Sequence, residues 1–485
     1  MAKKTVKLNL IVDKSCNRLV YAESDGHFVD ILLSFLTLPL ASILRLTQQS
    51  MGSLNNLLKS VESLDSVCFS SEACISMLLC PSNSASHLLT SLPIEYDNLL
   101  PLYFTCSSSS SCSNDHLISF YANAHCPCGG LMNKQLKFVA DRHAPASSNA
   151  HSSVFCNTAV NFTIREDLLV SQSSVECSIE QLSKLDINHM RSLESVSVDV
   201  TAENIVKLLK QMLVSDTPLT DVFLGVHKAE KCKLQADDIQ QPLRPKCHEA
   251  EAPAASSSST RKISMKLYVD KDEGILVSEA DNDFVDLLFG FLAYPMGAVI
   301  SKLGGHSGFR CMDNLYNSLE ALKSAKCFRN KELIGKLLSP KLPPFFKVKN
   351  QLIKLDEETY QTRSYLFTCS NQHCQYSSKV GCNEASTCCF CRPLNPTYPK
   401  CGPKDDPSIG GGYMRISKYM ITDNLFIHQP PSHVIIADIL RKAAAGNGIH
   451  PRDVEIGEHE ALALLRASIT SKNVLTDALL PFKKG

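Results

Sequence analysis

The sequence has no excess of charge of either sign. It contains 49 Lys plus Arg and 49 Asp plus Glu, which gives a formal net charge of zero. This balance produces no long-range electrostatic field that would attract nucleic acid or an anionic membrane. Tryptophan is also absent, but its absence excludes no class of function. The charge balance therefore argues against nucleic acid and membranes as partners.

The sequence also lacks an apolar run long enough to span a bilayer. The most apolar run, residues 31–44, holds 14 uncharged residues between Asp30 and Arg45, whereas a spanning helix needs about 20. Pro39 lies within this run and would kink or end a helix. A secretory signal would place its apolar region directly after a basic start, but a strand-like segment comes first here. We therefore expect a buried core helix at residues 30–44, and a protein of the cytosol or nucleus.

Known catalytic motifs are missing as well. The sequence contains no phosphate-binding loop, no G-x-G-x-x-G, no G-x-S-x-G and no H-E-x-x-H. We assign no catalytic residue and no organic cofactor from the sequence.

An internal duplication is the strongest feature that is present. The segment ESDGHFVDILLSFLTLP (23–39) shares nine of 17 positions with EADNDFVDLLFGFLAYP (279–295). Further matches follow in unbroken order, such as FTIREDLLV (162–170) with YMITDNLFI (419–427), at a period of about 257 residues. This period is too long for a solenoid repeat. We predict two copies of one domain, residues 1–227 and 261–485, joined by a polar flexible linker at 228–260.

Each copy reads as a mixed helix-and-sheet domain of the α+β class. VKLNLIVD and RLVYAE alternate like two strands around a polar turn, and the second copy has matching segments. An apolar helix should start near Asp25 and near Asp281, and two further helices carry apolar stripes at residues 54–64 and 205–213. We expect each copy to bury its own apolar helix. Whether the copies pack together or hang apart on the linker is left open.

These repeated segments resemble a plant-specific family catalogued as domain of unknown function 674. The similarity rests on the opening VKLNLIVDKSCNRLVYAESDGHFVDILLSFLTLPL, on KLYVDKDEGILVSEADNDFVDLLFGFL, on YMITDNL and on LLRASITSKNVLTDALL. It extends over nearly the whole chain, including the two-copy layout. The resemblance implies no activity, because none is assigned to the family.

The 21 cysteines include two clusters that recur between the copies. Cysteines of a cytosolic or nuclear protein stay reduced, which favours metal binding over disulfides. A structural zinc site needs four soft or borderline ligands on two short loops. We predict structural zinc, and the candidate ligands are Cys106, Cys112, His125, Cys126 and Cys128 in the first copy, and Cys369, Cys374, Cys388, Cys389 and Cys391 in the second.

The sequence leaves the closing pair of each zinc site open. It could be Cys126 with Cys128, or His125 with Cys128 at the commoner spacing of two intervening residues. In the second copy the same choice lies between Cys389 and Cys388 as the partner of Cys391. The competing interpretation is that these cysteines are small buried apolar side chains. A serine-rich stretch, CSSSSSCSN, makes the first-copy site the weaker of the two. Cys16 belongs to no pattern and is assigned no role.

A set of acidic residues recurs as well: Glu23, Asp25 and Asp30 in the first copy, and Glu279, Asp281 and Asp286 in the second. Such carboxylates can perform acid–base chemistry or bind a hard metal ion. They also suit helix starts, where carboxylates cap backbone N–H groups and complement the helix dipole. The capping interpretation is the stronger one.

Three functions remain on this basis. The first is a non-catalytic interaction or scaffold module with protein partners and a structural zinc site, which the residues favour over an enzyme. The second is an enzyme with an acidic site between the two copies. The third is nucleic-acid binding through the cysteine loops, but Lys347, Lys349, Lys354 and Lys379 are scattered rather than clustered.

Overall fold

The computed structural model contains helices and antiparallel sheets, which confirms the α+β class. It describes residues 6–89, 92–94, 96, 102–107, 118–126, 128–138, 153–183, 185, 187–225, 261–270, 274–323, 327–343, 345–358, 366–368, 379–380, 395–397, 412–429, 436–437, 441 and 449–480. We call residues 1–227 the first half and residues 261–485 the second half.

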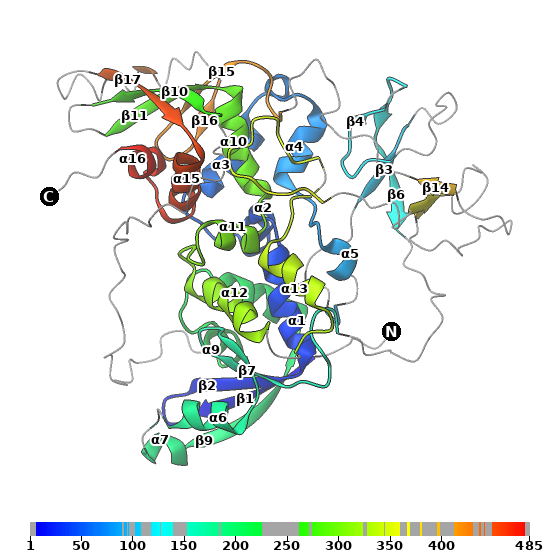
Figure 1. Cartoon of the computed structure of the whole chain (residues 1–485), viewed down its shortest axis with the longest axis vertical. Helices are drawn as coiled ribbons and strands as arrows, with labels where there is room; N and C mark the ends of the chain where they lie inside the picture. The colour runs from blue at the N-terminus through cyan, green and yellow to red at the C-terminus, as the bar shows by residue number, and fades with distance from the viewer. Residues whose placement is uncertain are drawn as a thin grey trace.

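Each half contains one five-stranded antiparallel sheet. The first sheet has the order β8-β7-β2-β1-β9, with bounds β1 Val6–Asp13, β2 Arg18–Ser24, β7 Phe162–Arg165, β8 Val170–Gln172 and β9 Leu193–Val200. The second has the order β16-β15-β11-β10-β17, with bounds β10 Ile263–Val269, β11 Ile275–Asp281, β15 Lys418–Ile421, β16 Ile427–His428 and β17 His450–Ile456. Corresponding strands occupy corresponding places in the two sheets. The sheets lie at opposite ends of the molecule, with helices between them (Figure 1).

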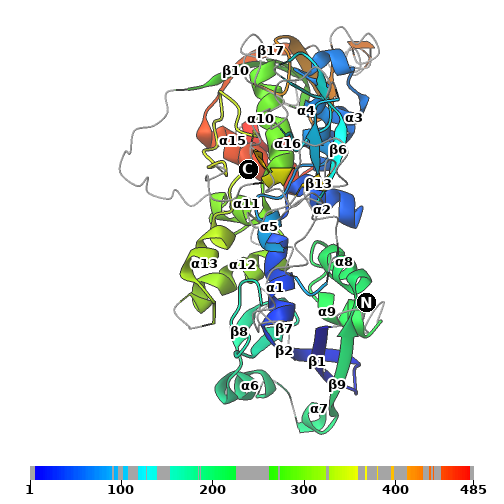
Figure 2. The same ribbon diagram turned by 90° about the vertical axis from the view of Figure 1, so that its right-hand side faces the viewer.

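Most helices lie between the sheets (Figures 1 and 2). Those of the first half are α1 Gly26–Ser34, η1 Phe35–Thr37, α2 Leu40–Thr47, α3 Leu54–Ser63, η2 Ser66–Cys68, α4 Glu72–Leu79, α5 Ser86–Leu89, α6 Val175–Leu182, α7 Ile187–Arg191, α8 Ala202–Gln211 and α9 Pro218–Phe223. Those of the second half are α10 Asn282–Ala293, α11 Met296–Lys302, α12 Arg310–Leu322, α13 Lys331–Leu338, α15 Glu458–Thr470 and α16 Val474–Leu479. Unlike most of the helices, α6 and α7 lie at the outer end of the molecule beside the first sheet (Figures 1 and 2).

The apolar run at residues 30–44 is buried throughout, as expected. It is not one helix, because α1 ends at Ser34, η1 follows at Phe35–Thr37, and Pro39 stands at the N-cap of α2. A helix that is apolar all round must be enclosed on every side. α1 and its counterpart α10 meet this condition, since Phe28 and Phe284 are both fully buried. Within the described part of the chain, no helix combines the length and apolar character needed to cross a bilayer.

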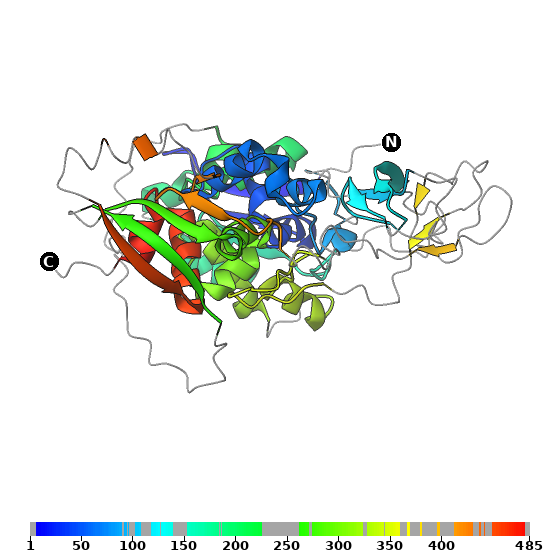
Figure 3. The ribbon, with the colours of Figure 1, turned by 90° about the horizontal axis from the view of Figure 1, so that it is seen from above.

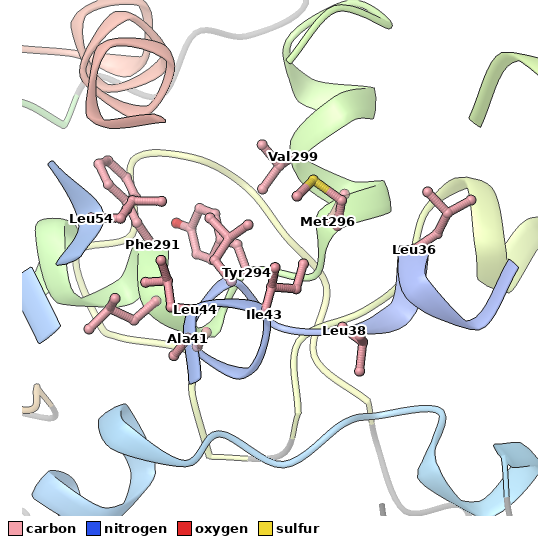
Figure 4. Packing of buried hydrophobic residues seen from close by; sticks show 14 of the residues in the cluster. Leu36, Leu38, Ala41, Ile43, Leu44, Leu54, Phe291, Tyr294, Met296 and Val299 are labelled. Carbon is pink, nitrogen blue, oxygen red and sulfur yellow. The ribbon is translucent and has the colours of Figure 1, made fainter. Parts of the chain in front are cut away.

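The two halves meet at Pro39 and Pro295, which form an isolated antiparallel bridge. Leu40 N donates to Tyr294 O at 3.0 Å, and Met296 N donates to Leu38 O at 3.0 Å. Side chains of both halves pack around this junction (Figure 4). One hydrophobic cluster runs through both halves, so they pack together rather than hanging apart.

Two helices, α3 and α12, each pack against the other half. α3 of the first half packs against α10 and β16 of the second half, and Ser60 Oγ accepts a hydrogen bond from Ile427 N at 3.0 Å. In the reverse direction, α12 packs against α1 and β8, and Ser318 Oγ accepts from Val170 N at 2.8 Å. The expectation that each half buries its own apolar helix therefore holds only in part, because α1 and α10 each pack against their own sheet and also against the other half. α10 contacts α2, α3 and α4 of the first half as well as its own β11 and α15.

Short strands form a separate outlying region beside the helical core. β3 Tyr103–Thr105, β6 Lys134–Phe138 and β13 Lys379–Val380 form a sheet of order β13-β6-β3. Two small pairs accompany it, β4 Ala124–His125 with β5 Leu131–Met132, and β12 Leu366–Thr368 with β14 Asn395–Thr397. Seen from above, this region lies to one side of the molecule (Figure 3). It contains the first cysteine cluster.

Candidate functional site

The structure brings three predicted cysteines of the first half together. Cys106 directly follows β3, and Cys126 and Cys128 follow β4. The Sγ atoms of Cys106 and Cys128 are 3.5 Å apart, and all three sulfur atoms lie within 4.8 Å of one another. Cys106 and Cys126 are buried while Cys128 is exposed. Three thiolates at this spacing match three corners of a tetrahedral zinc site.

A tight turn positions two of these cysteines. Cys126 N donates to Gly130 O at 2.9 Å, and Gly129 N donates back to Cys126 O at 2.8 Å. Gly129 has φ +86°, a left-handed conformation that glycine adopts without steric cost. The turn follows β4, which pairs with β5. The turn therefore places Cys126 and Cys128 together beside Cys106.

His125 is not part of this cluster. It is exposed and lies on β4, where it pairs with Leu131. Among the described residues, the geometry therefore favours Cys126 with Cys128 as the closing pair. The remaining predicted ligands of both halves lie outside the described residues, and they are Cys112, Cys369, Cys374, Cys388, Cys389 and Cys391.

Asp30 is the most buried of the recurring acidic residues, with no exposed surface. Its carboxylate accepts hydrogen bonds from Ser153 Oγ and Val154 N, from Phe155 N at 3.0 Å and from Cys156 N at 2.8 Å. Burial raises the pKa of Asp30, and these hydrogen bonds oppose the increase. The carboxylate holds a backbone segment in place, and its oxygens are engaged by this segment.

Asp286 repeats this arrangement in the second half. It is 3% exposed, and its Oδ1 accepts from Tyr413 N at 2.8 Å and Met414 N at 3.0 Å. The approach of the backbone is so close that a Cβ on Gly412 would lie 1.8 Å from Asp286 Oδ2. Only glycine fits there. In both halves, the segment that the aspartate holds forms an isolated β-bridge with the other half. Cys156 pairs with Phe328, and Met414 pairs with Phe69.

The other recurring acidic residues lie at the ends of β2 and β11. Asp25 is the N-cap of α1 and accepts from His27 N at 2.9 Å. Asp281 stands at the N-cap of α10 without a side-chain cap hydrogen bond, and instead pairs with Lys418 Nζ at 2.9 Å. Glu23 and Glu279 are half-buried on the strands. Capping thus applies to Asp25, whereas Asp30 and Asp286 hold backbone loops inside the core.

A second recurring pair of carboxylates was not singled out from the sequence. Glu166 accepts from Thr220 N at 3.0 Å and from Thr220 Oγ1 at 2.6 Å. Asp423 accepts in the same way from Thr476 N at 2.8 Å and from its hydroxyl at 2.9 Å. Burial raises the pKa of Glu166 to about 7, and burial also raises the pKa of Asp423. Each carboxylate thereby links a helix near the end of its half, α9 or α16, to a β-turn.

Another cluster of ligand-type side chains lies at the end of the first hairpin. Asp13, Cys16 and His189 place their ligand atoms within 4.8 Å of one another. Burial alone would raise the pKa of Asp13, but hydrogen bonds from Ser15, Ser192 and Cys16 outweigh it and hold the pKa below its usual value. The sequence gives no signal for this cluster, because His189 lies more than 170 residues from Cys16. Cys16, to which the sequence assigns no role, has clear partners.

The family described as "Protein of unknown function (DUF674)" matches residues 2–445 of the chain. No curated protein matches the chain. No solved structure matches it either. Because the family match covers most of the sequence, the chain belongs to the DUF674 family.

Proposed function

We propose that this protein is a non-catalytic interaction or scaffold module, built from one α+β domain repeated in tandem and holding structural zinc in its cysteine-rich loops. In this proposal it works in the cytosol or nucleus, where its thiolates stay reduced. Its partners are proteins, because the chain carries no net charge to attract nucleic acid or an anionic membrane.

Contacts that recur in both halves support the duplication. Ser60 and Ile427 form one hydrogen bond, and Ser318 and Val170 form its counterpart with the roles of the halves reversed. The neighbouring asparagines repeat as well, since Asn56 Nδ2 donates to the backbone of the second half and Asn314 Nδ2 to that of the first. A molecule derived from a homodimer that exchanged helices would show this reciprocity.

The observation that carries the non-catalytic assignment is the state of the recurring carboxylates. The two deepest of them, Asp30 and Asp286, accept hydrogen bonds from backbone N–H groups of their own half. A general acid or base needs an oxygen within reach of a substrate. Carboxylates that are enclosed and occupied in this way stabilise the fold instead.

The zinc assignment rests on the three converging thiols of the first half. Cys112, the remaining predicted cysteine of that half, would supply the fourth ligand, and four protein ligands would close the site to water. In the second half Cys369 and Cys391 correspond to Cys106 and Cys128 by sequence. Cys389 corresponds to Cys126, so we assign it as the closing ligand with Cys391, alongside Cys374.

Metal analysis of the purified full-length chain tests this assignment. We expect Cys106→Ser to contain one zinc ion fewer per chain than the wild type and to melt at a lower temperature. Cys80→Ser, which replaces an exposed cysteine outside the cluster, and His125→Ala should both keep the wild-type zinc content. A wild-type chain without zinc, or a Cys106→Ser variant with unchanged zinc, would overturn the structural zinc site.

A further inference from the structure

We propose that Asp13, Cys16 and His189 form a second metal site, distinct from the cysteine cluster, which takes a borderline divalent cation such as Zn²⁺. Two of the ligands lie at the turn between β1 and β2, and the third lies on α7. The first-half sheet continues through β9, which follows α7 and pairs with β1. The fold therefore brings together residues that are far apart in sequence.

The two carboxylate oxygens of Asp13 have different neighbours. Oδ1 accepts from Ser15 N at 2.9 Å, from Ser15 Oγ at 2.6 Å and from Ser192 Oγ at 2.6 Å. Oδ2 faces Cys16 Sγ at 3.2 Å and contacts His189 Nδ1. The hydroxyl groups thus orient the carboxylate through one oxygen, as outer-shell partners of metal ligands do. The other oxygen faces the two softer ligands.

The ligand set fits zinc. Zn²⁺ binds Cys sulfur, His nitrogen and carboxylate oxygen, and three protein ligands leave a fourth position for water or another ligand. Binding would release the thiol proton of Cys16, and the neutral His189 ring would carry its proton on Nε2, because the bound forms are thiolate and neutral imidazole with a free Nδ1 lone pair. The Asp13 side chain is 3% exposed and that of His189 is 19% exposed. The site is therefore enclosed by protein yet reachable from solvent.

The second half offers an internal comparison. Asp270 corresponds to Asp13, and its Oδ1 accepts from Gly274 N at 2.8 Å. The turn that follows, KDEG, contains no cysteine. The duplicated hairpin thus retains the aspartate that organises the turn but lacks the soft ligand, so the proposed site belongs to the first half alone.

Titration of the metal-free full-length chain with Co²⁺ and with Zn²⁺, against a competing chelator, tests this site. We expect Cys16→Ser and His189→Gln each to bind one ion fewer per chain than the wild type, whereas Cys80→Ser binds the wild-type number. The missing cobalt spectrum should be that of a site with a single thiolate. Ser192→Ala, which removes an orienting hydrogen bond and no ligand, should weaken binding about tenfold to a hundredfold.

If Asp13, Cys16 and His189 only form hydrogen bonds and bind no metal, the titrations give the opposite results. In that case Cys16→Ser and His189→Gln bind as many ions as the wild type, and the proposal is overturned. His189→Cys guards against misfolding, because it keeps a zinc ligand but loses the imidazole hydrogen bond. It should retain the ion if the site is real, and a correctly folded His189→Cys chain without the ion would count against the site. The cysteine cluster is tested separately by Cys106→Ser, so either site can fail alone.

Discussion

Replacing Asp30 by alanine should destabilise the protein strongly. The change removes the acceptor of three backbone N–H groups, those of Val154, Phe155 and Cys156, in a place without solvent exposure. A buried N–H left without an acceptor costs about 1–3 kcal/mol. Because the loop can relax and water can enter the space, we expect a total loss of about 3–6 kcal/mol in the free energy of unfolding.

Urea unfolding followed by far-ultraviolet circular dichroism measures this loss, and tryptophan is not needed for it. Asp25→Ala is the matched control, because it removes an exposed helix cap from the same element and should cost only about 1 kcal/mol. Asp286→Ala should lie between the two, since it frees the two N–H groups of Tyr413 and Met414.

The same experiment separates a scaffold from an enzyme. Catalytic carboxylates are often held in strained, unfavourable surroundings, so that their removal stabilises the fold. An Asp30→Ala variant as stable as the wild type, or more stable, would refute the role of Asp30 in holding the loop. It would also support the acidic enzyme site as the better hypothesis.

Two further predictions concern the buried carboxylates and the exchanged helices. Burial raises the pKa of the Glu166 carboxyl to about 7, so the folded chain binds the Glu166 proton more tightly than the unfolded chain does. The stability that this proton adds is present in full below about pH 4.5. It falls by up to about 3 kcal/mol as the pH rises to 7. Glu166→Gln should flatten the pH profile of stability in that window, and an unchanged slope would contradict the assignment. Ser60→Ala should cost about 1–2 kcal/mol, because Ile427 N loses its buried acceptor. Ser318→Ala should cost a similar amount through Val170, and a loss in only one of the two variants would contradict equivalent exchange.

Much of the local structure was predictable from periodicity and end signals. The alternation in residues 6–24 predicted β1 and β2, and the apolar stripe at residues 54–64 predicted α3. Asp25 marked the start of α1, because a carboxylate before an apolar run is typical of a helix N-cap. β9, an edge strand, was missed although Val196, Val198 and Val200 alternate with polar residues in LESVSVDV, a pattern typical of a strand.

The cysteine cluster was predictable only in part. Recurring spacing singled out Cys106 and Cys128, but spacing alone could not choose between His125 and Cys126. In the structure, the turn at Gly129 places Cys126 rather than His125 close to Cys106 and Cys128. The site at Asp13 and His189 could not have been found, because a hydrogen-bonded sheet and not sequence proximity brings its two segments together.

The sequence by itself determined the repeated order of strands and helices, the burial of the apolar run at Pro39 and the residue types that recur in each half. Only the tertiary structure decided that α3 and α12 change places between the halves. An apolar stripe specifies that a helix must be covered but not by which surface, because hydrophobic burial is non-directional. The two halves carry sheets of matching strand order, so the sequence pattern alone does not indicate which half covers α3 or α12.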